Sequence, residues 1–107
     1  MIRWYTRSKT NNLVNVTKYS KGFRFSFEKE DMQKIAPSGK VMFGIEGKAV
    51  YFAPHKNGYD AVEQVHRCFF AVTKDEVLKE LETFAGQHPL FYDGEFYYIT
   101  SDNMEVE

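Results

Sequence analysis

Alternation of apolar and polar residues marks the clearest strand of the 107-residue chain. From Phe23 to Glu28 every second residue is phenylalanine and the residues between are polar. This period of two predicts a strand with one face in the core. Looser alternation of β-branched residues predicts a preceding strand over Leu13–Tyr19, and Ser20-Lys21-Gly22 predicts the turn between them. We therefore expect a hairpin over residues 13–28.

The next segment carries the pattern of a short helix followed by a second hairpin. Apolar residues lie on one side of residues 29–36, and Pro37 ends this helix. Alternation resumes at Val41, and the turn at Glu46-Gly47 returns the chain as a strand to about residue 52. The polar residues 55–60 predict a loop.

The second half of the chain has a similar order of patterns. Residues 66–72 read as a strand, and an apolar stripe at helical spacing predicts a helix from about residue 73 to Gly86. An aromatic hairpin follows over residues 90–100, where Asp93-Gly94 is the signal of a type I′ turn.

These patterns align as a repeat. Residues 27–32 correspond to 72–77 at an offset of 45, and residues 46–52 correspond to 93–99 at an offset of 47. We expect an α+β fold: one compact domain, residues 1–107, of two strand–short helix–β-hairpin units. The basic unit covers about 13–54, the acidic unit about 66–100, and an acidic tail follows at 102–107. Two interpretations stay open: an internal duplication packed as a pseudo-dimer, or chance recurrence of a common arrangement.

Charge divides the chain into two halves. Residues 1–56 contain eleven Lys or Arg and four acids, whereas residues 57–107 contain three Lys or Arg and eleven acids. Such asymmetry concerns partners rather than fold, and it indicates that an anionic partner meets the first half.

Several classes of protein are disfavoured by what the sequence lacks. No apolar run approaches the roughly 18 residues that a membrane span needs, and the N-terminus lacks the apolar stretch of a signal peptide. The single Cys68 favours a reducing, cytoplasmic setting. Phosphate-loop, nucleophile-elbow and zinc-protease motifs are absent, so we expect a protein that is not an enzyme and that needs no cofactor.

The order of elements from Leu13 to Pro54 resembles the AbrB/MazE/SpoVT swapped-hairpin DNA-binding domain. The resemblance covers about 42 of the 107 residues and includes the Ser20-Lys21-Gly22 turn and the turn at Ser38-Gly39-Lys40. Glu28-Lys29 stands where the family usually has a proline before its helix. The resemblance implies DNA binding by a basic arm and the first hairpin, in a family that dimerises.

Our first hypothesis is accordingly a small DNA-binding regulatory protein. Basic side chains neutralise phosphates, and exposed aromatic rings stack on unpaired bases. The alternative is that the nearby aromatic residues Trp4, Tyr5 and Tyr19 are core and the charges only solvate a face. The candidate nucleic-acid ligands are Lys18, Lys21 and Arg24, with Arg3, Arg7 and Lys9 as an accessory arm.

The second hypothesis is a protein-interaction module, an inhibitor or adaptor of the small kind that mobile elements carry. A hairpin strand has two faces, so either Tyr97 or the pair Phe96 and Tyr98 must face outward or meet another subunit. A second core against the other half and an ordinary solvated helix are the competing interpretations. The candidate interface residues are Tyr92, Phe96, Tyr97, Tyr98, Glu76 and Glu80.

A third, minor hypothesis is a zinc or Cys–His site. His66 and Cys68 lie on one face of the predicted strand, and His55 or His88 supplies a further ligand. Neither the usual C-x-x-C nor the H-x-x-H spacing is present, so a buried cysteine with nearby solvated histidines is the simpler interpretation, and we expect no metal.

Overall fold

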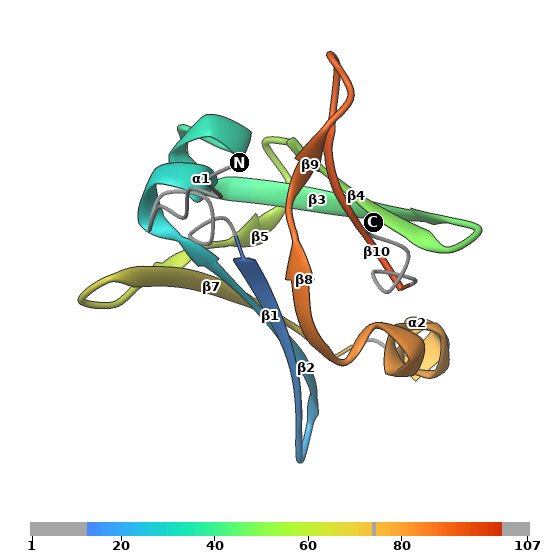
Figure 1. Ribbon diagram of the computed structural model, residues 1–107. Helices are drawn as coiled ribbons and strands as arrows, with labels where there is room; N and C mark the ends of the chain where they lie inside the picture. The colour runs from blue at the N-terminus through green and yellow to red at the C-terminus, as the bar shows by residue number, and fades with distance from the viewer. Residues whose placement is uncertain (1–12, 74, 102–107) are drawn as a thin grey trace, which may run out of the picture.

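Two five-stranded antiparallel sheets enclose the core in the computed structural model, which describes residues 13–73 and 75–101 (Figure 1). The first sheet has the strand order β6-β7-β2-β1-β8 and the second has the order β5-β3-β4-β10-β9. The strands of the first sheet are β1 (Leu13–Tyr19), β2 (Gly22–Glu28), β6 (Val62–Glu63), β7 (Arg67–Val72) and β8 (Gly86–Pro89). Those of the second sheet are β3 (Lys40–Glu46), β4 (Ala49–Pro54), β5 (Tyr59–Asp60), β9 (Phe91–Tyr92) and β10 (Tyr97–Thr100). The α+β expectation is thus confirmed, with strands in the majority.

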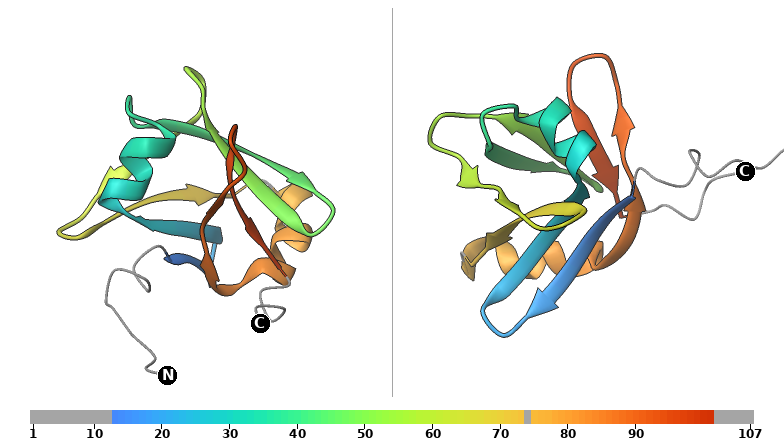
Figure 2. Two further views of the ribbon diagram at one scale, coloured as in Figure 1. Left: turned by 45° about the horizontal axis from the view of Figure 1, so that its top comes forward. Right: turned by 90° about the vertical axis from the view of Figure 1, so that its left-hand side faces the viewer.

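Two short helices lie at opposite ends of the sheets (Figure 2). Helix α1 (Lys29–Ile35) connects β2 with β3 and contacts β2, β4 and β7. Helix α2 (Asp75–Leu81) connects β7 with β8, contacts β2, and continues into the 3₁₀ turn η2 (Glu82–Phe84). The predicted second helix therefore has a tighter last turn than its apolar stripe indicated. No helix of the described residues is long and apolar enough to cross a membrane.

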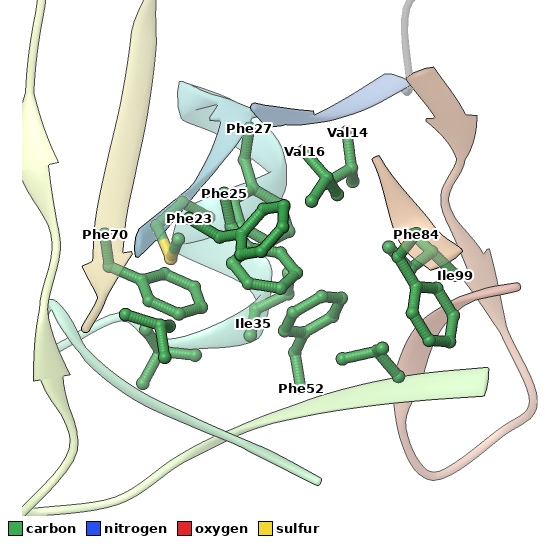
Figure 3. Packing of buried hydrophobic residues seen from close by; sticks show 14 of the residues in the cluster. Val14, Val16, Phe23, Phe25, Phe27, Ile35, Phe52, Phe70, Phe84 and Ile99 are labelled. Atoms are coloured by element: carbon green, nitrogen blue, oxygen red, sulfur yellow. The ribbon is translucent and has the colours of Figure 1, made fainter. Parts of the chain in front are cut away.

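The core lies between the sheets and is rich in phenylalanine (Figure 3). Phe23, Phe25 and Phe27 are at most 1% exposed, which confirms the interpretation of the alternating segment. The Phe25 ring stacks on Phe70 of β7 with 5.1 Å between ring centroids, and it meets Phe52 of β4 edge to face at 5.6 Å. Rings from both sheets thus form one cluster.

The two predicted units join through their strands. β2 pairs with β7 and β4 pairs with β10, both antiparallel. Phe25 lies opposite Phe70, and Tyr51 lies opposite Tyr98. These are the positions that the sequence repeat makes equivalent at its offsets of 45 and 47.

The aromatic hairpin forms as predicted, but its predicted turn type is wrong. A type I′ turn needs positive φ at both central residues. Only Gly94 has it, since no described non-glycine residue has positive φ. Tyr92 pairs with Tyr97, so the loop has four residues rather than two. The Asp93 carboxylate closes this loop by accepting hydrogen bonds from the amides of Glu95 and Phe96, both at 2.8 Å.

Three short strands, β5, β6 and β8, are not predicted by the sequence patterns. The predicted loop over residues 55–60 is wrong at its end, because Tyr59 and Asp60 form β5 and pair with Val41 and Lys40 of β3. β6 and β8 were not predicted either; β6 pairs with β7, and β8 pairs with β1. These strands complete the edges of both sheets.

Candidate interaction surfaces

The first hairpin presents its predicted basic residues on different sides. Lys18 lies opposite Phe23, whose side chain is buried, whereas Arg24 lies opposite Thr17, which is exposed. Alternation along the strands therefore places Lys18 and Arg24 on opposite faces of the first sheet. Lys21, in the turn between them, is exposed.

Lys18 contacts the acidic half of the chain. Its Nζ lies 3.2 Å from Oε2 of Glu82, and both side chains are more than half exposed. An exposed pair of this kind contributes at most about 1 kcal/mol, so an anionic ligand can displace the glutamate at little cost. The proposed arm residues Arg3, Arg7 and Lys9, and also Trp4 and Tyr5, lie outside the described residues.

Arg24 is held on an aromatic platform. Its guanidinium carbon lies 4.3 Å from the ring centroid of Phe69 and 5.3 Å from that of Tyr19. Stacking on ring faces orders the guanidinium while it stays exposed. Sequence patterns indicated the charge of Arg24 but not Phe69, which comes from β7.

Arg67, the other arginine of this face, is engaged by the protein itself. Its Nε donates to Ser26 Oγ at 2.7 Å, and its Nη2 donates to the carbonyl oxygens of Ser26 at 2.6 Å and Leu13 at 3.0 Å. Its Nη1 lies 3.4 Å from Glu28 Oε2. Arg67 therefore ties β7 to β2 and β1, and the exposed cations of this hairpin are Lys18, Lys21 and Arg24.

The aromatic hairpin divides its rings between two faces. Tyr97 packs against the core, whereas Phe96 and Tyr98 contact Tyr51 on the outer face of the second sheet. Tyr92, at the edge of that sheet, is 57% exposed. Of the two arrangements considered for this hairpin, the structure has the one with Phe96 and Tyr98 outward.

A hollow of about 490 Å³, here called the hairpin groove, lies on this outer face. Met42, Gly44 and Tyr51 line it from β3 and β4, and Phe96 lines it from the hairpin. Its lining also includes the three carboxylates of Glu46, Asp93 and Glu95. No Lys or Arg lines it. Amide hydrogen bonds from Phe96 and Glu95 lower the pKa of Asp93, so this carboxylate stays charged.

Sequence reasoning identified Phe96 but missed the other walls of the groove. Met42, Gly44 and Tyr51 occupy the outward positions of two strands. The alternation of apolar residues in the sequence could have identified these positions. The predicted interface residue Glu80 lines a neighbouring hollow, and the side chain of Glu76 lies outside those that the structure describes.

The candidate Cys–His residues do not form a cluster. Cys68 is buried, and burial raises the pKa of its thiol. His66 and His55 are exposed, whereas His88 is buried and donates from Nε2 to the carbonyl oxygen of Phe84. Among the described residues, no three His, Cys, Asp or Glu side chains are placed to hold a metal ion.

Asp31 is a buried acid that the sequence did not single out. It is 4% exposed in the first turn of α1, and its Oδ2 has no hydrogen-bond partner among the described residues. Burial raises the pKa of this carboxyl above the unfolded value of 3.8. The folded protein therefore binds the carboxyl proton of Asp31 more tightly than the unfolded chain does. This difference stabilises the folded state fully below pH 3.8, and the stabilisation is lost as the pH rises through the raised pKa.

We expect Asp31→Asn to raise the free energy of unfolding at pH 7 and to change it little near pH 3. The amide keeps the shape of the carboxyl but removes the buried charge. Urea titrations of both proteins across this pH range would measure the effect, with Glu30→Gln, the exposed neighbour, as control. A loss of stability at pH 7 would contradict the expectation.

No family model matches the chain, and the searches of curated proteins and of solved structures also found no match.

Proposed function

We propose that this protein is a DNA-binding regulator whose two units form an internal pseudo-dimer of the swapped-hairpin type, with DNA contacting the first hairpin. The proposal rests on one observation above all. Strand pairings in the first unit recur in the second at the offsets of the sequence repeat.

The pairings between units illustrate this recurrence. Lys40 of β3 lies opposite Asp60 of β5. Lys40 corresponds to Gln87, 47 residues later, and Asp60 corresponds to Asn15, 45 residues earlier. Asn15 and Gln87 also lie opposite each other, in β1 and β8. Equivalent residues meet at the centre of both junctions, since Phe25 pairs with Phe70 and Tyr51 with Tyr98. A residue lies opposite its own counterpart only near a two-fold axis, so this register supports a pseudo-dimer.

The pairings within units follow the same rule. In the first hairpin Thr17 lies opposite Arg24, and their counterparts Val62 and Phe69 pair in the second unit. The register of β3 with β4 likewise recurs in that of β9 with β10. The register preserved in these ladders supports an internal duplication over chance recurrence of a common motif.

The symmetry does not extend to charge. The counterparts of Lys18, Lys21 and Arg24 at the offset of 45 are Glu63, His66 and Phe69. The second unit thus has an acid where the first has Lys18, and it contributes Phe69 as the support of Arg24. We infer a one-sided DNA contact, with one basic hairpin per chain.

Binding of a labelled DNA duplex, followed by fluorescence anisotropy from about 50 to 200 mM salt, tests this proposal. Each phosphate contact adds about 0.9 to the slope of log affinity against log salt. We therefore expect Lys21→Ala combined with Arg24→Ala to weaken binding and to reduce the slope by about two.

The matched control for this experiment is Lys48→Ala combined with Lys56→Ala, two exposed lysines outside the hairpin. The control should leave the slope unchanged if the first hairpin is the contact. Absence of binding at the lowest salt would overturn the DNA proposal. Equal losses in the two double variants would overturn the assignment to this hairpin.

A protein-interaction role is the second candidate, and the hairpin groove favours it. Aromatic residues and methionine are enriched in protein interfaces, and the groove combines both with acidic lining. The two roles use different sheets, so one chain can have both.

A further inference from the structure

Strand β3 has a free edge along most of its length. β5 pairs only with Lys40 and Val41, and no other described strand pairs with β3 on that side. The amide of His55 donates to the carbonyl of Lys40 at 3.2 Å, so Lys40 and every second residue after it direct their backbone groups toward β4. By alternation, the N–H and C=O groups of Phe43 and Ile45 point away from β4 and toward the free edge.

Residues 42–45 of this edge lack the lysine and proline that often prevent strand addition. Residues 42–45 are Met-Phe-Gly-Ile, with no charge and no proline. Proteins usually protect an edge with lysine, proline, a bulge or a covering loop. An apolar edge at which the N–H and C=O groups of two residues, Phe43 and Ile45, face outward is a template for an added strand.

Hollows lie on both sides of the edge. Both hollows border residues 42–45 of β3. The hairpin groove continues over β4 to the aromatic hairpin. The second hollow, of about 390 Å³ and here called the edge hollow, continues instead to residues 57–59 and to Val77 and Glu80 of α2. Side chains of an added strand alternate between two faces, so they would enter the two hollows in turn.

The two hollows differ in chemistry. The groove contributes the three carboxylates Glu46, Asp93 and Glu95, whereas the edge hollow has one carboxylate, Glu80, beside the side chains of Tyr59 and Val77. No Lys or Arg lines either hollow. Basic side chains therefore complement the outer side and apolar side chains complement the inner side.

We infer that β3 binds an extended segment of a partner protein in which Lys or Arg alternates with aliphatic residues. The backbone of the segment pairs with Phe43 and Ile45, its basic side chains face the hairpin groove, and its aliphatic side chains enter the edge hollow. The inference rests on the protein-interaction candidate and is independent of DNA binding.

The test uses the full chain and a fluorescein-labelled peptide, Lys-Val-Arg-Val-Lys-Val-Arg. The control peptide Lys-Arg-Lys-Arg-Val-Val-Val has the same charge and the same composition without alternation. We expect anisotropy to show binding of the first peptide and at least about tenfold weaker binding of the second, because only alternation fills both hollows. Equal binding of the two peptides, or no binding of the first, would overturn the inference.

Two further measurements separate strand addition from simple charge attraction. Bound peptide should slow hydrogen exchange of the Phe43 and Ile45 amides at least about tenfold. Glu46→Lys with Glu95→Lys should weaken binding at least about tenfold, whereas the control Glu30→Lys with Glu63→Lys, also exposed acids, should not. Loss of binding in the first double variant without amide protection would leave the groove as an interaction surface but would refute strand addition.

Discussion

Phe25→Ala should lower the free energy of unfolding by about 3–5 kcal/mol, the largest loss expected from any single change in the chain. The Phe25 side chain is fully buried and lies opposite Phe70, at the junction of the two units. Its ring contacts Phe43, Phe52 and Phe70 at centroid distances of 5.1 to 5.8 Å. Alanine would leave a cavity lined by rings of both sheets, which cannot collapse without moving either sheet.

Urea unfolding followed by circular dichroism would measure this loss. Phe91→Ala is the matched control, because Phe91 is 37% exposed and should cost about 1 kcal/mol or less. Phe70→Ala should resemble Phe25→Ala, and the double variant should show a coupling of about 0.5–1.5 kcal/mol from the stacked pair. Similar losses in Phe25→Ala and Phe91→Ala would mean that the core does not centre on this junction.

The elements with strong local patterns were predictable. The alternating phenylalanines of β2 and the apolar side of α1 need no distant partner to be recognised, and both form where expected. β8 has the sequence Gly-Gln-His-Pro, which has no strand propensity. It is a strand because β1, about seventy residues earlier in the chain, offers a partner at its edge. Short edge strands of this kind depend on tertiary contacts, which periodicity does not contain.

The candidate surfaces also combine residues that the sequence identifies with partners that only the tertiary structure brings beside them. Sequence identified Lys18 and Arg24 as cations, yet their partners Glu82 and Phe69 come from elements of the other half. Arg67 counted only as one of three basic residues in an acidic half, whereas its hydrogen bonds connect three strands. Alternation identifies which residues face outward, but the position of the aromatic hairpin beside Met42 and Tyr51 depends on the pairing of β4 with β10.

Gly22→Ala should have the largest effect outside the phenylalanine cluster, a loss of about 3 kcal/mol, at the upper end of the range for overpacking. The sequence presents Gly22 as a turn glycine after Ser20-Lys21, but the structure adds a second requirement. A Cβ at this position would lie 2.1 Å from the carbonyl oxygen of Val72 and 3.1 Å from the Cα of Thr73. Both are backbone atoms, so the end of β7 would have to move away from β2.

Gly44→Ala is the matched control for this change. Gly44 also lies in a strand, but a Cβ there meets no atom within 4 Å. Alanine at residue 44 should therefore be neutral or stabilise by about 0.5 kcal/mol, because it restricts the unfolded chain. Thermal unfolding of the two variants would measure the contrast. Because Gly22 lies where β7 closes against the first hairpin, its variant should also loosen the platform of Arg24, and under the DNA-binding proposal it should bind DNA more weakly. A stable Gly22→Ala protein would contradict the close approach of β2 and β7 at this point.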